Sequence, residues 1–388
     1  AGGATQSGFG RTGTVDWQTG SIKTGTFVPV SGEGYFVDTS GGVSTANLPA
    51  GVAGAIVSFA DYTRTFQTNN LTIVPNGSEK IGGVAANFLA STEGQSITLV
   101  YVDATEGWIN TSESTGQAGL NPAFIVATGG TITTVDTDYK VHTFTGPGTF
   151  TVCSAGNPLG SGSVDYLVIG GGGSGAWDGG GGAGAGGYRF SNGTASGSYC
   201  AGPAPLGASA LPVSVQGYPI TVGAGGSPIT SSTNSNPGAD SIFSTITSAG
   251  GGGGAKSGQP SGPGGSGGGI RGGSGQGSGN TPPVSPPQGN DGNIGPSNAG
   301  GGGGAGAVGT IGGSCASSPG GPGGAGLTSN ITNTPTVRGG SGGTRPSSTK
   351  GGDGTANTGG GGGGGGVPGA SGTGAGGSGI VVIRYKFQ

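Results

Sequence analysis

The stretch VDYLVIGGGG, residues 164–173, decides how this chain folds. It begins as an apolar segment rich in β-branched and aromatic residues, which predicts a strand, and it continues directly into glycine. A second apolar strand, IVVIRYKF at residues 380–387, follows the glycine-rich block. We expect the two strands to pair, because pairing closes the block and confines residues 170–379 to one compact body.

The chain has two parts that differ in glycine content. Residues 1–150 hold 24 of the 103 glycines, which leaves 79 for the other 238 residues, about one-third of that part. Such a composition favours disorder by default. The bracketing strands argue against disorder, because each needs the other as a partner.

Two ordered structures compete for residues 170–379. Collagen requires glycine at every third position, and this block breaks that register at residues 281–288 and 327–338, which contain no glycine. The alternative is a bundle of polyglycine II helices, each with three residues per turn and no internal hydrogen bonds. Every backbone N–H and C=O then needs a partner on a neighbouring helix or in water.

The glycine pattern also predicts which helices are buried. Uninterrupted runs at residues 250–254, 300–304 and 359–366 are expected in the interior, because a Cβ would keep neighbouring backbones apart. Residues 262–269 and 320–326, interrupted by Pro, Ser or Ala, are expected at the surface. Three aromatic residues are expected to clamp the glycine layers: Trp177, Tyr188 and Tyr199.

The part before the glycine block is predicted to be all-β, with essentially no α-helix. Residues 1–12 form a connector, and residues 13–115 form a small β module, an antiparallel sandwich or barrel. Its candidate strands are residues 25–30, 34–39, 55–61, 71–74, 96–103 and 108–110. Residues 120–169 open the glycine-rich domain with a hairpin around the turn 146–148, and residues 380–388 close it.

Composition excludes several classes of function. Only 7% of residues are charged and the net charge is −3, so no patch for a nucleic-acid backbone is expected. The apolar stretches are far shorter than the roughly 20 residues that span a bilayer, so no membrane insertion is expected.

The sequence also lacks the motifs that are typical of catalytic and metal-binding sites. His142 is the only histidine and alternates within a strand, which favours a structural role. No triad, histidine zinc cluster or phosphate loop is present. We therefore predict no catalytic, metal or cofactor site, and a protein that is not an enzyme. Cys153, Cys200 and Cys315 allow one disulfide, such as Cys153–Cys200, or free buried thiols.

Five segments carry a resemblance to a known family: KVHTFTGPGTFTV (residues 140–152), VDYLVIGGGG, GAGGYR (184–189), YPITVGAGG (218–226) and GGSGIVVIRY (376–385). Together they resemble the glycine-rich domain of phage tail and structural proteins, over residues 140–388. The domain is similar in kind to the tip adhesin of T-even-like long tail fibres, whose glycine runs form a sandwich of polyglycine II helices with variable loops at the distal end. The N-terminal part resembles a small β module of cyanophage structural proteins, and it lacks a recognisable fibre-docking helix.

The resemblance implies a virion tail fibre or tail-tip adhesin, located outside the cell. Its expected partners are a host surface receptor, protein or glycan, and other tail or fibre proteins, or copies of itself in a homotrimer. Loops between glycine helices should carry recognition, because the backbone array fixes their ends. Within residues 275–298 and 327–350 the candidate receptor-binding residues are Asn290, Asp291, Arg338, Arg345 and Lys350. A passive structural subunit of a virion appendage or extracellular filament is the alternative.

Overall fold

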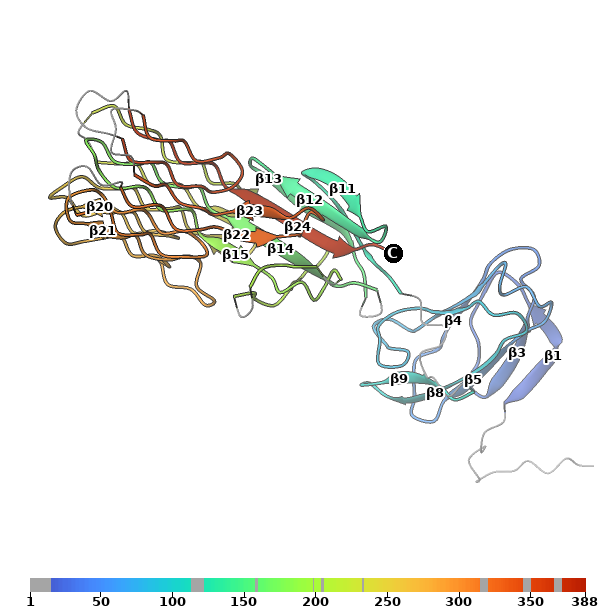
Figure 1. Ribbon diagram of the computed structural model, residues 1–388. Helices are drawn as coiled ribbons and strands as arrows, with labels where there is room; N and C mark the ends of the chain where they lie inside the picture. The colour runs from blue at the N-terminus through green and yellow to red at the C-terminus, as the bar shows by residue number, and fades with distance from the viewer. Residues whose placement is uncertain are drawn as a thin grey trace, which may run out of the picture. The chain divides into compact units, whose positions relative to one another are not determined.

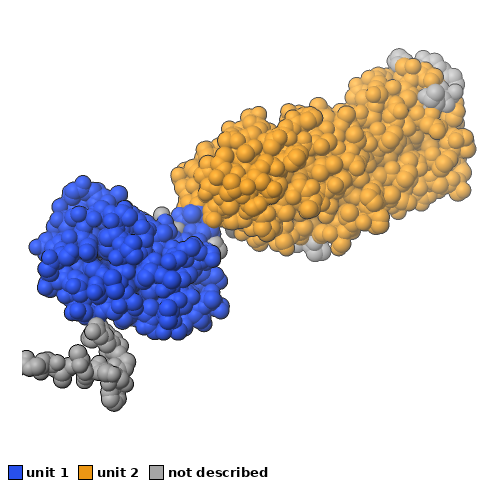
Figure 2. All heavy atoms as spheres, turned by 180° about the vertical axis from the view of Figure 1, so that it is seen from behind, with its two compact units in different colours: residues 1–123, 157–159 blue, residues 124–156, 160–388 orange. Residues whose placement is uncertain are grey.

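The computed structural model describes residues 15–112, 122–157, 160–197, 199–203, 206–231, 234–314, 320–344, 350–365 and 372–388. These residues contain strands, turns and extended segments and no α-helix, and none of the sheets closes into a barrel. The chain divides into two compact units, coloured separately in Figure 2. Unit 1 is formed by residues 1–123 with 157–159, and unit 2 by residues 124–156 with 160–388.

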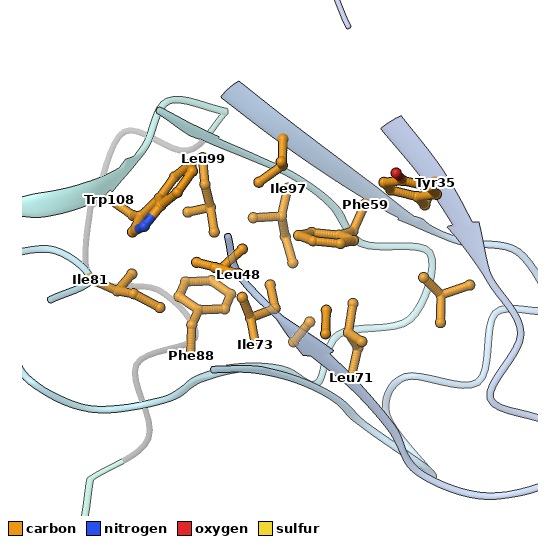
Figure 3. Packing of buried hydrophobic residues seen from close by; sticks show 14 of the residues in the cluster. Tyr35, Leu48, Phe59, Leu71, Ile73, Ile81, Phe88, Ile97, Leu99 and Trp108 are labelled. Carbon is orange, nitrogen blue, oxygen red and sulfur yellow. The ribbon is translucent and has the colours of Figure 1, made fainter. Parts of the chain in front are cut away.

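Unit 1 is a sandwich of two sheets, with strand orders β1-β3-β5-β8-β9 and β2-β4-β6-β7. Its strands are β1 (Asp16–Lys23), β2 (Thr26–Phe27), β3 (Glu33–Val37), β4 (Ser44–Asn47), β5 (Ile56–Asp61), β6 (Leu71–Val74), β7 (Phe88–Ala90), β8 (Ser96–Asp103) and β9 (Gly107–Asn110). Alternating residues of both sheets point inward and form one core, in which Phe59, Phe88 and Trp108 are fully buried (Figure 3). The six predicted strands of this module are present, and the sandwich is confirmed.

The antiparallel arrangement predicted for this module is only partly correct. From β1 to β6 successive strands alternate between the two sheets, so that β3 pairs in parallel with β1 and β5, and β4 pairs in parallel with β2 and β6. Each short connection crosses to the opposite sheet instead of folding back beside its own strand. Antiparallel pairing occurs at β6–β7 and β8–β9, where consecutive strands share a sheet, and between β5 and β8.

Unit 2 begins and ends in a block of strands. One sheet has the order β10-β13-β17-β18-β19, and the other has the order β11-β12-β24-β14-β15, with β16 paired to β14. The strands are β10 (Ile125–Thr128), β11 (Thr131–Val135), β12 (Tyr139–Phe144), β13 (Gly148–Ala155), β14 (Ser163–Ile169), β15 (Tyr188–Phe190), β16 (Leu211–Pro212), β17 (Gly217–Thr221), β18 (Ser241–Phe243), β19 (Ile246–Ser248) and β24 (Ile380–Lys386). Small pairs β20 (Ile270–Arg271) with β21 (Ile294–Gly295) and β22 (Leu327–Ser329) with β23 (Thr336–Arg338) complete the set.

The predicted closing pair is confirmed. β14 and β24 lie antiparallel, with Ile169 opposite Ile380 and Asp165 opposite Arg384, so the glycine block leaves and returns at one place. The predicted hairpin around residues 146–148 is wrong. β12 pairs with β11 and β24 in one sheet, whereas β13 pairs with β10 and β17 in the other, so this turn crosses between sheets.

The glycine segments bond sideways with a period of three. N–H groups of three successive residues, 171, 172 and 173, donate to three different segments, at Ala239, Gly377 and Gly184. The next three residues repeat the same order of neighbours, at Asn236, Gly374 and Gly181. A helix with three residues per turn and no internal hydrogen bonds produces this pattern. The polyglycine II bundle is therefore confirmed, and Figure 1 shows its segments running side by side away from the strands.

Residues 181–187 form the centre of the bundle. Their seven N–H groups donate to residues 249–255, 299–304 and 359–365, and their carbonyls accept from 170–176, 266–269 and 339–344. All seven residues are buried within these six neighbours. Ala183 and Ala185 lie in this central helix with no exposed surface, so an interior helix accommodates a Cβ at selected positions.

Burial follows most of the predicted order. The described parts of the three uninterrupted runs, residues 250–254, 300–304 and 359–365, are buried. In residues 320–326, Pro322 and Ala325 face solvent while Gly321 and Gly324 are buried, as expected for one turn per three residues at the surface. The prediction for residues 262–269 is wrong, because residues 264–269 are buried and the chain reverses direction within them.

Candidate functional site

The bundle has two ends, and they differ in what covers them. At the near end the glycine segments continue into β14, β15, β18, β19 and β24. At the far end, where Figure 1 labels β20 and β21, the described segments reverse direction in short turns. We call the described turns 177–180, 256–260, 272–274 and 296–298 the far-end turns. They hold the polar and aromatic side chains that interrupt the glycine there.

One arginine ties three of these turns together. Arg271 lies at the end of β20, and its Nε donates to the carbonyl of Ser297 at 3.1 Å. Its Nη1 donates to the carbonyl of Asp178 at 3.3 Å. The N–H of Gly179 donates to Gly365 at 2.9 Å, and the N–H of Gly272 donates to Gly295 at 2.7 Å. The far-end turns are thus held by backbone acceptors instead of by a side-chain core.

A cavity of about 160 Å³ opens beside two of these turns, 177–180 and 256–260. Its lining includes Trp177 and the backbone of Gly253 and Gly254. Polar side chains complete the lining: Asn234, Ser235, Lys256 and Gln259. Trp177 is half-buried, in contrast to Tyr188 and Tyr199, whose hydroxyl groups are buried near the strands. The predicted clamping role therefore fits the two tyrosines, whereas the tryptophan borders an opening.

Three predicted receptor-binding residues lie near the strands and act within the scaffold. Asn290 Nδ2 donates to the carbonyls of Gly304 at 2.8 Å and Ala305 at 3.1 Å. Asp291 Oδ1 accepts the N–H of Gly279 at 2.7 Å. Arg338 ends β23 and is only 8% exposed, and burial lowers its pKa. Their loops are long, which favours recognition, but both loops fold back over the strand block.

The other two predicted residues, Arg345 and Lys350, belong to the C-terminal part of the predicted loop 327–350. Lys350 is exposed, and its Nζ pairs with Asp353 Oδ2 at 2.9 Å. Asp353 also accepts the N–H of Ala375, which fixes the pair to the bundle. Arg345 lies outside the described residues. The five residues therefore do not form one site in the described structure.

Two segments cover the central sheet, and one of them lies in the predicted loop 327–350. The β22–β23 hairpin and residues 199–203 pack on the face of the sheet that contains β14 and β24, with Ile331 and Ala201 buried there. Arg384 is 1% exposed, stacks 4.7 Å from the Tyr139 ring centroid and 4.8 Å from that of Tyr199, and pairs with Asp136 at 3.0 Å. These segments are long because they cover the apolar face of the sheet, so their length is no evidence of receptor binding.

The remaining chemistry in the described residues is structural. His142 Nδ1 lies 2.7 Å from the Gly129 carbonyl, Nε2 lies 3.0 Å from Tyr385 Oη, and burial lowers the pKa of the imidazole. Cys153 and Cys200 are free and exposed, so they neither form the proposed bridge nor are buried. Within the described ranges, no three His, Cys, Asp or Glu side chains are grouped to hold a metal ion. No helix there is long and apolar enough to cross a membrane.

The sequence did not predict a site at the far-end turns, because long loops were expected to carry recognition and these turns are short. The available signal was chemical: Trp177 and Lys256 each end a glycine run, and side chains in a block of this composition are scarce. No curated protein matches the chain. A sequence model described as the glycine-rich domain matches residues 143–386. Because that match covers more than half of the 388 residues, this chain belongs to the glycine-rich domain family.

Proposed function

We propose that this protein is a receptor-binding adhesin of a virion tail fibre or tail tip. It would recognise a host cell-surface protein or glycan without catalysing a reaction, and other tail or fibre proteins would hold it on the particle. The observation that carries the proposal is the position of the far-end turns. They present Trp177, Lys256 and Gln259 at the end of a bundle whose backbone is bonded on all sides.

A rigid platform suits recognition for a physical reason. Binding loses less free energy to ordering when the contact residues are already held in place. Loops with fixed ends also tolerate sequence change without loss of the scaffold. The resemblance to tail-tip adhesins, whose variable loops lie at the distal end of such a bundle, supports the same assignment. The binding surface is therefore proposed at the far-end turns, in place of Asn290, Asp291 and Arg338.

Cell binding by the purified, fluorescently labelled full chain tests the proposal. Cells of a candidate host should bind the chain saturably, and a variant with Lys256→Ala and Gln259→Ala should bind about tenfold more weakly or worse. The matched control carries Lys80→Ala and Gln67→Ala in unit 1 and should bind as the parent does. Equal binding by both variants would contradict the assignment to the far end. Helical arrays of the chain in micrographs, with no cell binding, would support the passive structural subunit.

A further inference from the structure

The cavity at the far-end turns has the size of a site for one small ring. Its volume is about 160 Å³, below the roughly 300 to 1,000 Å³ of pockets that take drug-sized ligands. Gly253 and Gly254 contribute backbone to its lining. A Cβ at Gly253 would come within 3.0 Å of Ser235, which shows how closely the backbone approaches the wall.

The walls are fixed before any ligand arrives. Ser235 Oγ donates to the carbonyl of Gly175 at 3.2 Å, and the N–H of Asn236 donates to Ser174 Oγ at 2.8 Å. The glycine segment of the lining is bonded on both sides, because Gly254 N–H donates to Ser174 and Ala255 N–H donates to Gly269. A cavity bordered by such segments keeps its shape, and little ordering is needed on binding.

The lining combines one aromatic side chain with several neutral polar groups. Trp177 offers an indole ring. Asn234 and Gln259 offer amides that both donate and accept hydrogen bonds, and Ser235 offers a hydroxyl. Pyranose rings match this combination, because their C–H faces are apolar and their edges carry hydroxyl groups. The same lining suits a wholly apolar ligand poorly, because its polar groups would lose hydrogen bonds to water without replacement.

The charge around the cavity argues against a phosphate or polyanionic ligand. Among the described residues that line the cavity, Lys256 is the only one with a cationic side chain. The nearby Arg271 already donates to two backbone carbonyls, so its guanidinium is committed to holding the turns. Recognition of phosphate normally uses a convergent set of cations and backbone N–H groups.

We propose that this cavity binds one hexopyranose ring of a cell-surface glycan, with its apolar face against Trp177 and its hydroxyls on Asn234, Ser235 and Gln259. The inference rests on the proposed function, because it names the ligand class that the far end would recognise. It is narrower than that function, since receptor binding through a protein surface would leave the cavity unused.

Saturation-transfer NMR on the full chain tests the inference. The probes are glucose, galactose, mannose, N-acetylglucosamine and glucuronate, each added alone as the free monosaccharide. At least one should receive saturation, with a dissociation constant on the order of 1 mM, as expected for so few atoms. Gln259→Ala and Trp177→Leu should each weaken that binding about tenfold, since each removes one principal contact.

Two controls keep the result interpretable. Gln67→Ala makes the same change at an exposed glutamine of unit 1 and should leave binding unchanged. Gln259 is also exposed, so loss of binding in Gln259→Ala does not depend on a folding defect. If none of the five sugars binds, or if both cavity variants bind as the parent does, the inference is overturned. Cell binding that persists in that case leaves the adhesin proposal standing, whereas sugar binding without any cell binding removes only the adhesin proposal.

Discussion

Unit 1 and the glycine bundle of unit 2 lack α-helix in their described residues, yet they are held together in opposite ways. In unit 1 side chains do the packing: Phe59, Phe88 and Trp108 have no exposed surface and fill the space between two sheets. In the bundle the backbone does the packing, because each segment bonds sideways to its neighbours and few side chains intervene. The comparison teaches that the two units are sensitive to opposite kinds of substitution. Removing atoms should damage unit 1, and adding atoms should damage the bundle.

The largest expected effect is the insertion of a side chain at the centre of the bundle. A Cβ at Gly182 would lie less than 3.0 Å from the carbonyl oxygen of Gly342, and six bonded neighbours prevent either segment from moving away. Gly182→Val should therefore abolish cooperative folding of unit 2, or cost more than the roughly 1 to 3 kcal/mol of ordinary overpacking. Calorimetric unfolding of the full chain measures this.

The matched control is a glycine of the same bundle with open space. At Gly352 a Cβ meets no atom within 4 Å, so Gly352→Ala should leave the unfolding temperature of unit 2 unchanged or slightly higher. If Gly182→Val unfolds like the parent, the close packing of backbones is not what holds the bundle together.

The reverse substitution is expected to matter most in unit 1. Phe59 packs between β3 and β8 neighbours, with the Tyr35 ring centroid 6.4 Å from its own. Phe59→Ala should lower the free energy of unfolding of unit 1 by about 3 to 5 kcal/mol, because it leaves a cavity in a filled core. Urea unfolding followed by fluorescence of the buried Trp108 measures the change. A loss under 1 kcal/mol would mean that unit 1 is not held by its side-chain core.

A further pair of substitutions compares the buried carboxylate of Asp165, in the strand block, with the exposed ion pair between Asp353 and Lys350. Asp165 is fully buried, and its carboxylate accepts from Ser191 Oγ and Ser196 Oγ at 2.6 Å each and from the Ala195 N–H at 3.1 Å. Asp165→Asn should cost about 2 kcal/mol, because charge-assisted bonds to a buried carboxylate are lost. Asp353→Asn breaks the exposed pair with Lys350 and should cost less than about 0.5 kcal/mol. Chemical denaturation measures the free energy of unfolding of both variants. An equal loss in the two would contradict the larger contribution assigned to Asp165.

The smallest expected effect is a pH dependence that comes from His142. Burial lowers the pKa of this imidazole below its usual value of about 6.5. Between the two pKa values the unfolded chain binds more protons than the folded one, so stability is full above about pH 6.5 and falls as the pH drops toward the folded pKa. His142→Gln should therefore flatten the fall in the unfolding temperature of unit 2 between pH 7 and pH 5. Identical pH profiles for the variant and the parent would contradict this role.

The sequence predicted the parts of the fold that depend on local chemistry. The closing pair β14–β24 was evident from apolar β-branched runs, and the glycine runs were predicted as buried helices because only a bare backbone packs so closely. The central helix, residues 181–187, was missed because its alanines made it resemble a surface segment. Which segments become neighbours depends on the order of the reversals, and composition carries no record of that order.

The candidate site was harder to predict than the fold. Long loops were expected to carry recognition, but residues 327–338 instead cover an apolar sheet face, where Ile331 is buried. That face could not be seen in the sequence, because it forms only when β12, β14, β15 and β24 come together. The short turns at Trp177 and Lys256 gained importance from their position at the end of the bundle, which is a property of the fold.

Hydrogen exchange of the backbone amides at residues 181–187 tests the central claim most directly. These seven N–H groups, five of glycine and two of alanine, all bond to neighbouring segments and are all buried. In the full chain uniformly labelled with ¹⁵N, we predict that the amides of this stretch exchange as slowly as the strand amides of β14 and β24, through unfolding of the whole unit. Exchange within seconds, at the rate of an unstructured chain, would contradict the account of a rigid body built from laterally bonded backbone.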